Sequence, residues 1–213
     1  FDRLAQAGGQ PDPDTVMQAV GGVDFKYHYQ SAATLAAIAS KPWTHVILQN
    51  YSTQPTHLNS GSVADHYNYG TLLYEKIRQN NPQTQVILFE TWSRSAAHSM
   101  ITGVSGGSSF ASTAEFQIEL RTNYQGLAQA LNASHPGAPP VLVAPVGDAW
   151  EIAGGLRPAS DPLFVRLHGT DEYHGNNNGY YLAACVFYSL IYGASPQGLD
   201  NNPLITSLGL GLT

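Results

Sequence analysis

The run Gln85-Val-Ile-Leu-Phe89 decides the fold class of this chain. It is apolar on both faces, which is typical of a strand buried inside a parallel sheet rather than of a strand with one wet face. Two further runs have the same character, Thr44-His-Val-Ile-Leu-Gln49 and Pro140-Val-Leu-Val-Ala-Pro145. The long intervals between the three runs leave room for helices.

Segments with helical character separate these strands. The segment from Val63 to Asn80 carries Tyr69, Leu72, Leu73 and Ile77 at helical spacing and ends near Asn81-Pro82. Alternating strands and helices predict a three-layer α/β/α sandwich with a mainly parallel sheet. We also predict helices at Ser31–Ala39, Ala114–Ala133 and Gly179–Gly193, a helix end at Phe1–Gly9, a short strand at Thr15–Val20, a loop with some helix at Thr91–Ser112, and a helix or turn at Asp148–Gly155.

Composition limits the function classes. The 213 residues suit a single domain spanning 1–213, and we see no linker. Charged residues make up 11% and the net charge is -6, without a run of Lys or Arg, so no nucleic-acid partner is expected. No apolar run approaches the roughly 18 residues of a membrane span. Cys185 is the single cysteine, so it has no partner for an internal disulfide. Because it lies in an apolar run, we expect a buried, unreactive thiol.

The segment His168-Gly-Thr-Asp171-Glu-Tyr-His174-Gly carries the strongest chemical signal. An acid and an imidazole stand three residues apart on a loop that leads into an apolar helix. His174 has the chemistry of a general base, and Asp171 could set its tautomer. The alternative is that both residues only shape a turn and cap the helix.

The downstream sequence makes this segment resemble a known family. Asp171-x-x-His174, then Asn178-Gly179-x-Tyr181-Leu-Ala-Ala-Cys185-Val-Phe-Tyr, then Ser195-Pro196-x-Gly198-Leu199, is similar to the last conserved block of the SGNH (GDSL-like) hydrolases, bacterial branch. The resemblance runs from about Phe1 to Leu199. It implies the flavodoxin-like fold of that family and a Ser-His-Asp triad with Asp171 as the orienting acid and His174 as the base.

Glycines after a predicted strand form a second candidate feature. In an open α/β sheet the site lies at the carboxyl ends of the strands. Gly21-Gly22 lets backbone N–H groups approach a ligand, as an oxyanion hole requires, although an ordinary tight turn has the same sequence. The resemblance implies that one of these glycines faces the oxyanion, and we favour Gly22.

The ends of the other strands supply further candidates. The family's third block is usually Gly-x-Asn-Asp, but here it reads Leu-Gln49-Asn50-Tyr, so either amide is a candidate oxyanion donor and we favour Asn50; a strand-terminating Asn is the alternative. Gln49, Trp92 and Trp150 are candidates for a substrate pocket that takes an acyl or sugar group. The alternative is that the two tryptophans belong to the hydrophobic core, because aromatic side chains bury a large apolar area.

The nucleophile of the family is missing from this chain. It is a serine in a Gly-Asp/Asn-Ser sequence after the first strand, whereas no serine precedes Ser31 here. We therefore expect the first strand and the nucleophile upstream of Phe1, on an N-terminal segment or a second chain, so that the domain is N-terminally incomplete.

The functional expectation is a serine esterase that cleaves carboxylic esters and needs no metal or organic cofactor. The ester is an acetylated sugar, a lipid or a polyester, and the low charge with many small polar residues is typical of a secreted or periplasmic bacterial protein. The alternatives are a non-catalytic carbohydrate- or ligand-binding domain that keeps the fold, and a metal-dependent hydrolase that uses the scattered histidines.

Overall fold

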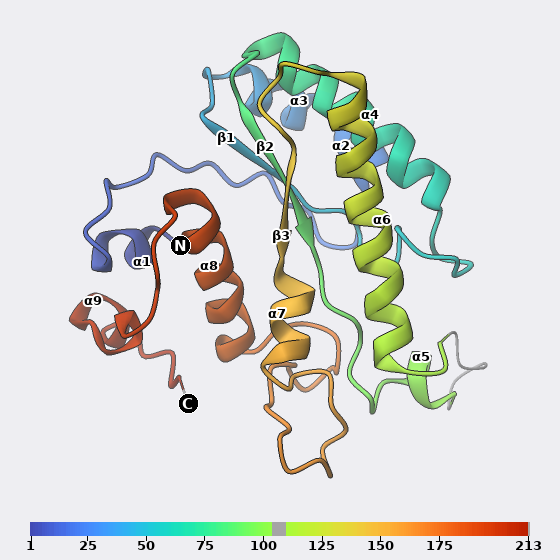
Figure 1. Cartoon of the computed structure of the whole chain (residues 1–213), viewed down its shortest axis with the longest axis vertical. Helices are drawn as coiled ribbons and strands as arrows, with labels where there is room; N and C mark the ends of the chain where they lie inside the picture. The colour runs from blue at the N-terminus through green and yellow to red at the C-terminus, as the bar shows by residue number, and fades with distance from the viewer. Residues whose placement is uncertain (104–109, 213) are drawn as a thin grey trace. The chain divides into compact units, whose positions relative to one another are not determined.

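The computed structural model describes residues 1–103 and 110–212 (Figure 1). Part of the predicted loop at Thr91–Ser112, residues 104–109, therefore lies outside the described residues. In chain order the elements are α1 (Asp2–Ala7), α2 (Phe25–Gln30), α3 (Ala32–Ala39), β1 (His45–Leu48), α4 (Val63–Asn80), β2 (Gln85–Glu90), α5 (Ser99–Thr102), α6 (Thr113–Ser134), β3 (Leu142–Pro145), α7 (Val146–Ile152), α8 (Asn177–Tyr192), η1 (Leu199–Asn201) and α9 (Pro203–Thr206).

The chain divides into two compact units. The sheet unit comprises Val16–Trp92 and Phe116–Pro145. The loop unit comprises Phe1–Thr15, Ser93–Glu115 and Val146–Thr213. In the parts of the chain that the structure describes, no helix combines the length and the apolar character needed to cross a bilayer.

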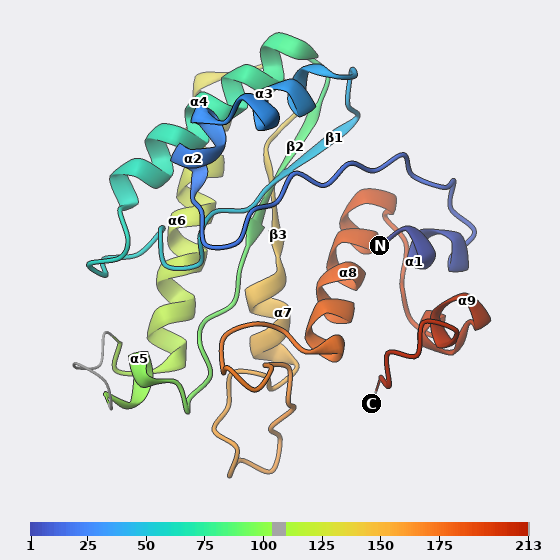
Figure 2. The ribbon, with the colours of Figure 1, turned by 180° about the vertical axis from the view of Figure 1, so that it is seen from behind.

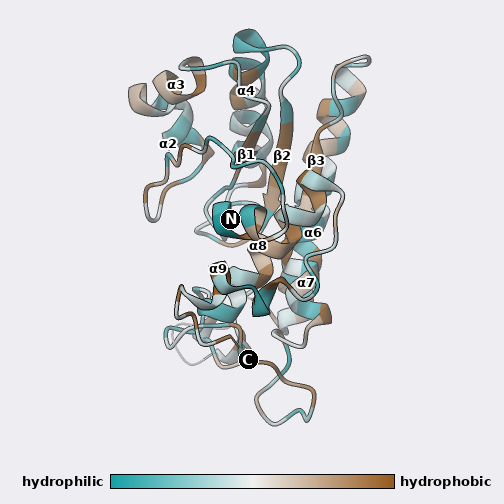
Figure 3. Ribbon diagram, turned by 90° about the vertical axis from the view of Figure 1, so that its left-hand side faces the viewer, coloured by the Kyte–Doolittle hydropathy of each residue, from teal (hydrophilic) through white to brown (hydrophobic). Residues whose placement is uncertain are grey.

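The sheet unit is built on three parallel strands in the order β1-β2-β3. Val46 of β1 pairs with Val86 of β2, and Leu88 of β2 pairs with Val143 of β3. All three strands are those predicted from the apolar runs, and their parallel pairing is confirmed. Figure 3 shows the hydrophobic character of β2, the central strand. The protein is therefore an α/β protein with a small parallel sheet.

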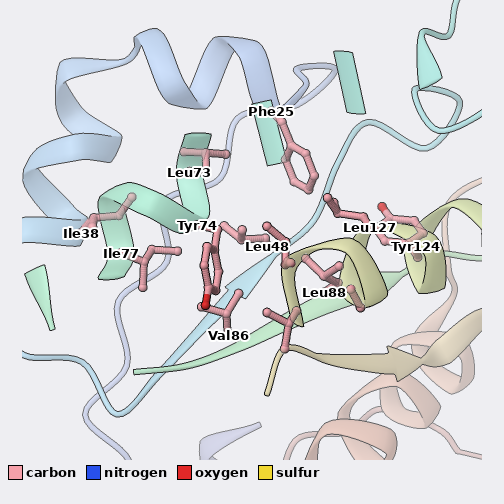
Figure 4. Packing of buried hydrophobic residues seen from close by; sticks show 13 residues of the cluster. Phe25, Ile38, Leu48, Leu73, Tyr74, Ile77, Val86, Leu88, Tyr124 and Leu127 are labelled. Carbon is pink, nitrogen blue, oxygen red and sulfur yellow. The ribbon is translucent and has the colours of Figure 1, made fainter. Parts of the chain in front are cut away.

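Helices α2, α3, α4 and α6 pack on one face of this sheet and form its core (Figure 4). Because side chains alternate along a strand, Leu48, Val86 and Leu88 share this face. Tyr74 and Leu127, from α4 and α6, are at most 1% exposed against them. Of the residues that the periodicity of Val63–Asn80 placed on one face, Leu73 and Ile77 are buried in this core, whereas Tyr69 and Leu72 are only partly buried. The remaining members of the core are Phe25, Ile38, Leu73, Ile77, Tyr124, Ala128, Leu131 and Val141.

Local capping explains where several helices begin. The Ser62 hydroxyl accepts a hydrogen bond from the N–H of Asp65 at the start of α4, and the Ser31 hydroxyl accepts one from Thr34 at the start of α3. Asp24 caps α2 by accepting from Tyr27. Helix α2 was not predicted from the sequence.

The predicted strand at Thr15–Val20 is wrong. Residues 11–20 have neither helix nor strand, and Val16, Met17 and Val20 are 56%, 87% and 43% exposed. A strand needs a partner for its backbone hydrogen bonds. This segment pairs with no strand in the described part of the chain, so its apolar residues stay in contact with solvent.

The loop unit is organised by α8, which packs with α1 and α9 (Figure 2). Leu4, Tyr188 and Ile205 are at most 3% exposed and come from α1, α8 and α9. Helix α8 agrees with the predicted closing helix, and it begins directly after the loop that carries Asp171 and His174.

Candidate functional site

The loop before α8 folds back on itself like a short hairpin. The N–H of Gly169 donates to the carbonyl of His174 at 2.8 Å, and the N–H of Asn176 donates to the carbonyl of Leu167 at 2.8 Å. Asn176 also caps α8, because its Oδ1 accepts from Gly179 at 3.0 Å. The loop is therefore attached to a rigid helix at its C-terminal end.

Asp171 and His174 form a close pair at the tip of this loop. Nδ1 of His174 lies 2.6 Å from Oδ2 of Asp171. The other carboxylate oxygen accepts from the N–H groups of Tyr173 at 3.1 Å and His174 at 2.9 Å. The side chains of His174 and Asp171 are 59% and 40% exposed. Within residues 1–103 and 110–212, Nε2 of His174 has no hydrogen-bond partner.

The contacts of Asp171 decide its ionisation. Desolvation opposes the charged form, but the hydrogen bonds from the side chain and backbone of His174 and from the backbone of Tyr173 outweigh it and lower the pKa of Asp171 to about 2. Asp171 is therefore an anion at neutral pH. An anionic acceptor keeps a proton on Nδ1 of His174 and leaves Nε2 as the nitrogen available to accept one.

Glu172, between the two, adopts a left-handed backbone conformation with φ of 63°. It is the one non-glycine residue with positive φ in the described chain. Its carboxylate accepts from the hydroxyl of Ser95 at 2.6 Å and from the guanidinium of Arg166 at 3.0 Å, and its carbonyl accepts from the N–H of Ser95 at 3.0 Å. Such conformations persist where the surroundings over-determine them, and they cluster at functional sites.

Aromatic packing holds the imidazole of His174 from one side. The ring centroids of Tyr173 and His174 lie 3.9 Å apart. The guanidinium of Arg94 lies 4.8 Å from the centroid of Tyr173, and the ring of His98 meets Tyr173 edge-on at 6.2 Å. These contacts restrict the rotation of His174 about its side-chain bonds.

His168, at the base of the loop, is an interior residue. It is 2% exposed, its Nε2 lies 3.0 Å from the carbonyl of Ser93, and its ring meets Trp150 edge-on at 4.9 Å. Burial lowers the pKa of His168, so it is neutral at physiological pH. Trp150 is itself fully buried, and Trp92, in the sheet unit, is 8% exposed with its ring 6.3 Å from Phe89. Both tryptophans, which the sequence placed in a candidate pocket, lie within the interior of their units.

A second group of candidates lies at the end of β1, in the sheet unit. Asn50 is 1% exposed, and its Oδ1 accepts from the N–H groups of Phe25 and Tyr51, both at 2.9 Å. Its Nδ2 lies 2.9 Å from Nδ1 of His66. Gln49 is exposed instead. Asn50 therefore joins the start of α2 to the end of β1 from inside the unit.

A pocket of about 360 Å³ opens beside these residues, entirely within the sheet unit. Gly22 lines it, with a φ of 74° that favours glycine, whereas Gly21 does not line it. The N–H of Gly22 has no hydrogen-bond partner among the described residues. The lining residues are Gly22, Val23, Asp24, Tyr27, Tyr51, Gln54 and Ser60.

The structure thus brings the predicted residues into two groups. Asp171 and His174 form a pair in the loop unit, and Gly22 and Asn50 lie in the sheet unit, with Gly22 in the pocket wall. Sequence reasoning missed Glu172 and Gln54. Glu172 gives no signal because its left-handed conformation is set by tertiary contacts, and Gln54 lies in a segment with no periodicity.

The described residues contain no group of three or more His, Cys, Asp or Glu that could hold a metal ion. Two of their histidines outside the loop instead form separate pairs with a single carboxylate each. Nδ1 of His57 lies 2.6 Å from Oε2 of Glu119, and Nε2 of His135 lies 2.8 Å from Oε1 of Glu75.

Comparison with known proteins bears on the fold. No family model matches the chain, and no curated protein matches it. Among solved structures it is similar to a DUF4886 family protein from Bacteroides uniformis ATCC 8492, with 17% identity and a TM-score of 0.64 over 95% of this chain and 78% of that one. At this identity the similarity shows that the two proteins share an α/β fold.

Proposed function

We propose that the protein is a serine esterase of the SGNH type, in which His174 is the general base and Asp171 its orienting acid. The 2.6 Å contact between Oδ2 of Asp171 and Nδ1 of His174 is the observation that carries the proposal. A base in acyl transfer needs one nitrogen held by an acceptor and the other available to the nucleophile. The contacts of His174 satisfy both conditions.

The reaction is two-step acyl transfer. His174 takes a proton through Nε2 from the hydroxyl of a serine as its oxygen attacks the ester carbonyl, and it returns that proton to the leaving alcohol. A water molecule then repeats the sequence and releases the acid. The imidazolium formed in each step is stabilised by the Asp171 carboxylate, which the low pKa of that group keeps ionised. In this proposal the serine lies on a segment that precedes Phe1 or on a second chain.

Gly22 is the proposed oxyanion donor. Its N–H has no partner among the described residues, and it lines a pocket where a carbonyl oxygen can approach. The amide of Asn50 is the proposed second donor, through the hydrogen that it does not give to His66. Removing one such donor costs about 3 kcal/mol of transition-state stabilisation. In this proposal the fold is the three-layer α/β/α sandwich of the SGNH hydrolases.

Close His–carboxylate pairs also occur elsewhere in the chain. His57 and Glu119 have the same 2.6 Å separation as His174 and Asp171. The loop of His174 differs because it carries the strained backbone of Glu172 and is fixed by Ser95 and Arg166. His57→Ala is therefore a matched control that removes an equivalent pair.

The test measures p-nitrophenyl acetate and butyrate hydrolysis by the purified natural protein and both alanine variants, with intact mass before and after a serine-directed fluorophosphonate. We expect turnover to vanish in His174→Ala and to persist in His57→Ala, with the label on a serine that precedes Phe1. Loss of turnover in His57→Ala alone would transfer the role to the other pair. Absence of both turnover and label would overturn the esterase and leave the ligand-binding alternative.

A further inference from the structure

The pocket beside Gly22 is lined by Gln54, whose side-chain amide has no hydrogen-bond partner among the described residues. We propose that this pocket binds a neutral saccharide and that the ester substrate is an acylated sugar. Only the second part, that the bound sugar is also the substrate, rests on the proposed function.

Gln54 is the residue that points to a ligand. It is 7% exposed and lines the pocket, yet its side-chain amide has no hydrogen-bond partner in the described part of the chain. Its backbone is already engaged, because its N–H donates to Tyr51 at 2.8 Å and its carbonyl accepts from Ser62 at 2.9 Å. The amide atoms of Gln54 keep contact with solvent in the pocket, where a ligand can reach them. A ligand with hydroxyl groups, which both donate and accept, can bind the N–H and the C=O of this amide.

Two tyrosine rings supply the apolar walls of the pocket. Tyr27 and Tyr51 are 43% and 36% exposed. Tyr27 is braced edge-on by the ring of His28 at 5.6 Å, and the backbone of Tyr51 is held by Oδ1 of Asn50 at 2.9 Å. Aromatic rings combine a large apolar face with a polar hydroxyl. A sugar ring has the matching surface, with C–H groups on its faces and hydroxyls on its rim.

The charge of the lining argues against other ligand classes. Asp24 is the one charged residue of the pocket wall, and neither Lys nor Arg lines it. A phosphate or carboxylate ligand would meet an uncompensated like charge, which is unfavourable. Oδ1 of Asp24 caps α2 by accepting from Tyr27, which leaves Oδ2 to accept from a hydroxyl. A lipid chain is disfavoured as well, because Val23 is the one aliphatic side chain in the lining.

Size and position agree with a short acylated saccharide. The volume of about 360 Å³ is near the lower end of the range for small-molecule pockets. Gly22 in the same wall offers a free N–H, so a ring held by Gln54 and the tyrosines can present an ester carbonyl to this donor.

The experiment measures binding without turnover, by isothermal titration and saturation-transfer NMR on the natural protein carrying His174→Ala. The probes are methyl β-xylopyranoside, cellobiose and their mono-O-acetyl derivatives, with inorganic phosphate and ethyl butyrate as the competing ligand classes. Gln54→Leu keeps the size of the side chain but removes its hydrogen bonds, and Tyr51→Leu removes one ring. Tyr180→Leu, a 51% exposed tyrosine outside this pocket, is the control.

We expect saccharide affinity to fall by at least about tenfold in Gln54→Leu and in Tyr51→Leu, which corresponds to one lost polar contact, and to be unchanged in Tyr180→Leu. Thermal melting checks that each variant is folded. No saccharide binding at about 10 mM, or binding that both pocket variants retain, overturns the inference. Saccharide binding in a protein that never hydrolyses esters overturns the proposed function, and with it the assignment of the substrate, but supports the saccharide site. Ester hydrolysis without saccharide binding overturns this inference alone.

Discussion

Nδ2 of Asn50 lies 2.9 Å from Nδ1 of His66, and this contact sets the tautomer of a histidine with no exposed surface. Oδ1 of Asn50 already accepts from two backbone N–H groups, so the amide nitrogen must face His66 and donate to it. Nδ1 of His66 therefore carries no proton. The ring of Phe25 stacks on His66 at 5.5 Å and that of Tyr124 meets it edge-on at 5.0 Å, so no carboxylate compensates a charge there.

Protonation of His66 should destabilise the fold in acid. Burial, which outweighs an opposing contact with the backbone of Asn123, lowers the pKa of His66 from 6.5 to about 4. Between these values the unfolded chain binds more protons than the folded one, so stability is complete above about pH 6.5 and decreases as the pH falls toward 4. The loss is on the order of 3 kcal/mol.

Urea unfolding at several pH values in this window measures the effect. His66→Asn keeps an acceptor near the position of Nδ1 but does not titrate. We expect this variant to be less stable at pH 7, because it loses buried ring contacts, and to lose less stability in acid than the wild type. Parallel stability curves for the two proteins would show that another group is responsible.

Most of the fold could be predicted because its determinants are local. The strand Gln85–Glu90 is apolar on both faces, and the helix Val63–Asn80 has one apolar face and a Ser62 cap. The segment Thr15–Val20 looks equally apolar, but burial requires a partner strand that the segment itself does not reveal. Helix α2 is short and rich in aromatic residues with weak helix propensity, so its Asp24 cap is recognised only in the structure.

The candidate site was predictable where the spacing along the chain fixes the contact. Asp171 and His174 are three residues apart in the same loop, so their proximity could be predicted. The position of Asn50 at a strand end could be predicted as well, but its burial and its contact with His66, 16 residues away, depend on tertiary packing. The position of Gln54 in the pocket wall also depends on tertiary packing, so the sequence around it does not predict it.

Replacing Asp171 with asparagine should reduce esterase activity with little effect on stability. The amide cannot hold the proton on Nδ1 of His174 in the same way, and loss of the orienting acid costs up to about 10⁴-fold in kcat in a Ser-His-Asp enzyme. The side chains of His174 and Asp171 are 59% and 40% exposed, so the melting temperature should change little. Kinetics and thermal melting of Asp171→Asn and of the control Glu119→Gln measure both effects.

The pH profile gives an independent check on Asp171. Its pKa of about 2 means that it stays ionised at every pH from about 4 upward. Asp171 should therefore add no limb of its own to the acidic side of the wild-type pH profile. A limb that belongs to a carboxylate and disappears in Asp171→Asn would contradict the assignment.

The backbone conformation of Glu172 predicts an unusual order of stability. Glu172→Ala and Glu172→Gly both lose the side-chain contacts with Ser95 and Arg166, but of the two only glycine adopts a φ of 63° without strain. We expect the glycine variant to be more stable than the alanine variant by about 1 kcal/mol, although glycine costs more backbone entropy. Chemical denaturation of the two variants gives the difference, and a more stable alanine variant would show that the loop relaxes out of this conformation.

Gly179 lies in the first turn of α8, where two effects of an alanine substitution oppose each other. Alanine favours a helix over glycine by up to about 1 kcal/mol. A Cβ at Gly179, however, would meet the indole of Trp150 and the backbone carbonyl of Leu167. Overpacking of this kind costs about 1–3 kcal/mol, and neither a buried indole nor a backbone carbonyl can move aside easily. We therefore expect Gly179→Ala to destabilise the protein and to displace the loop that ends at Asn176.

Gly21→Ala is the matched control, because a Cβ there meets no atom within 4 Å and the backbone has no positive φ. Its stability should stay within about 0.5 kcal/mol of the wild type. Urea unfolding compares the two variants, and hydrogen exchange at residues 169–176 reports on the loop. If Gly179→Ala proves as stable as Gly21→Ala, the close approach of α8 to Trp150 does not hold the Asp171–His174 loop in place, and the anchoring must come from its other contacts, those of Glu172 and Asn176.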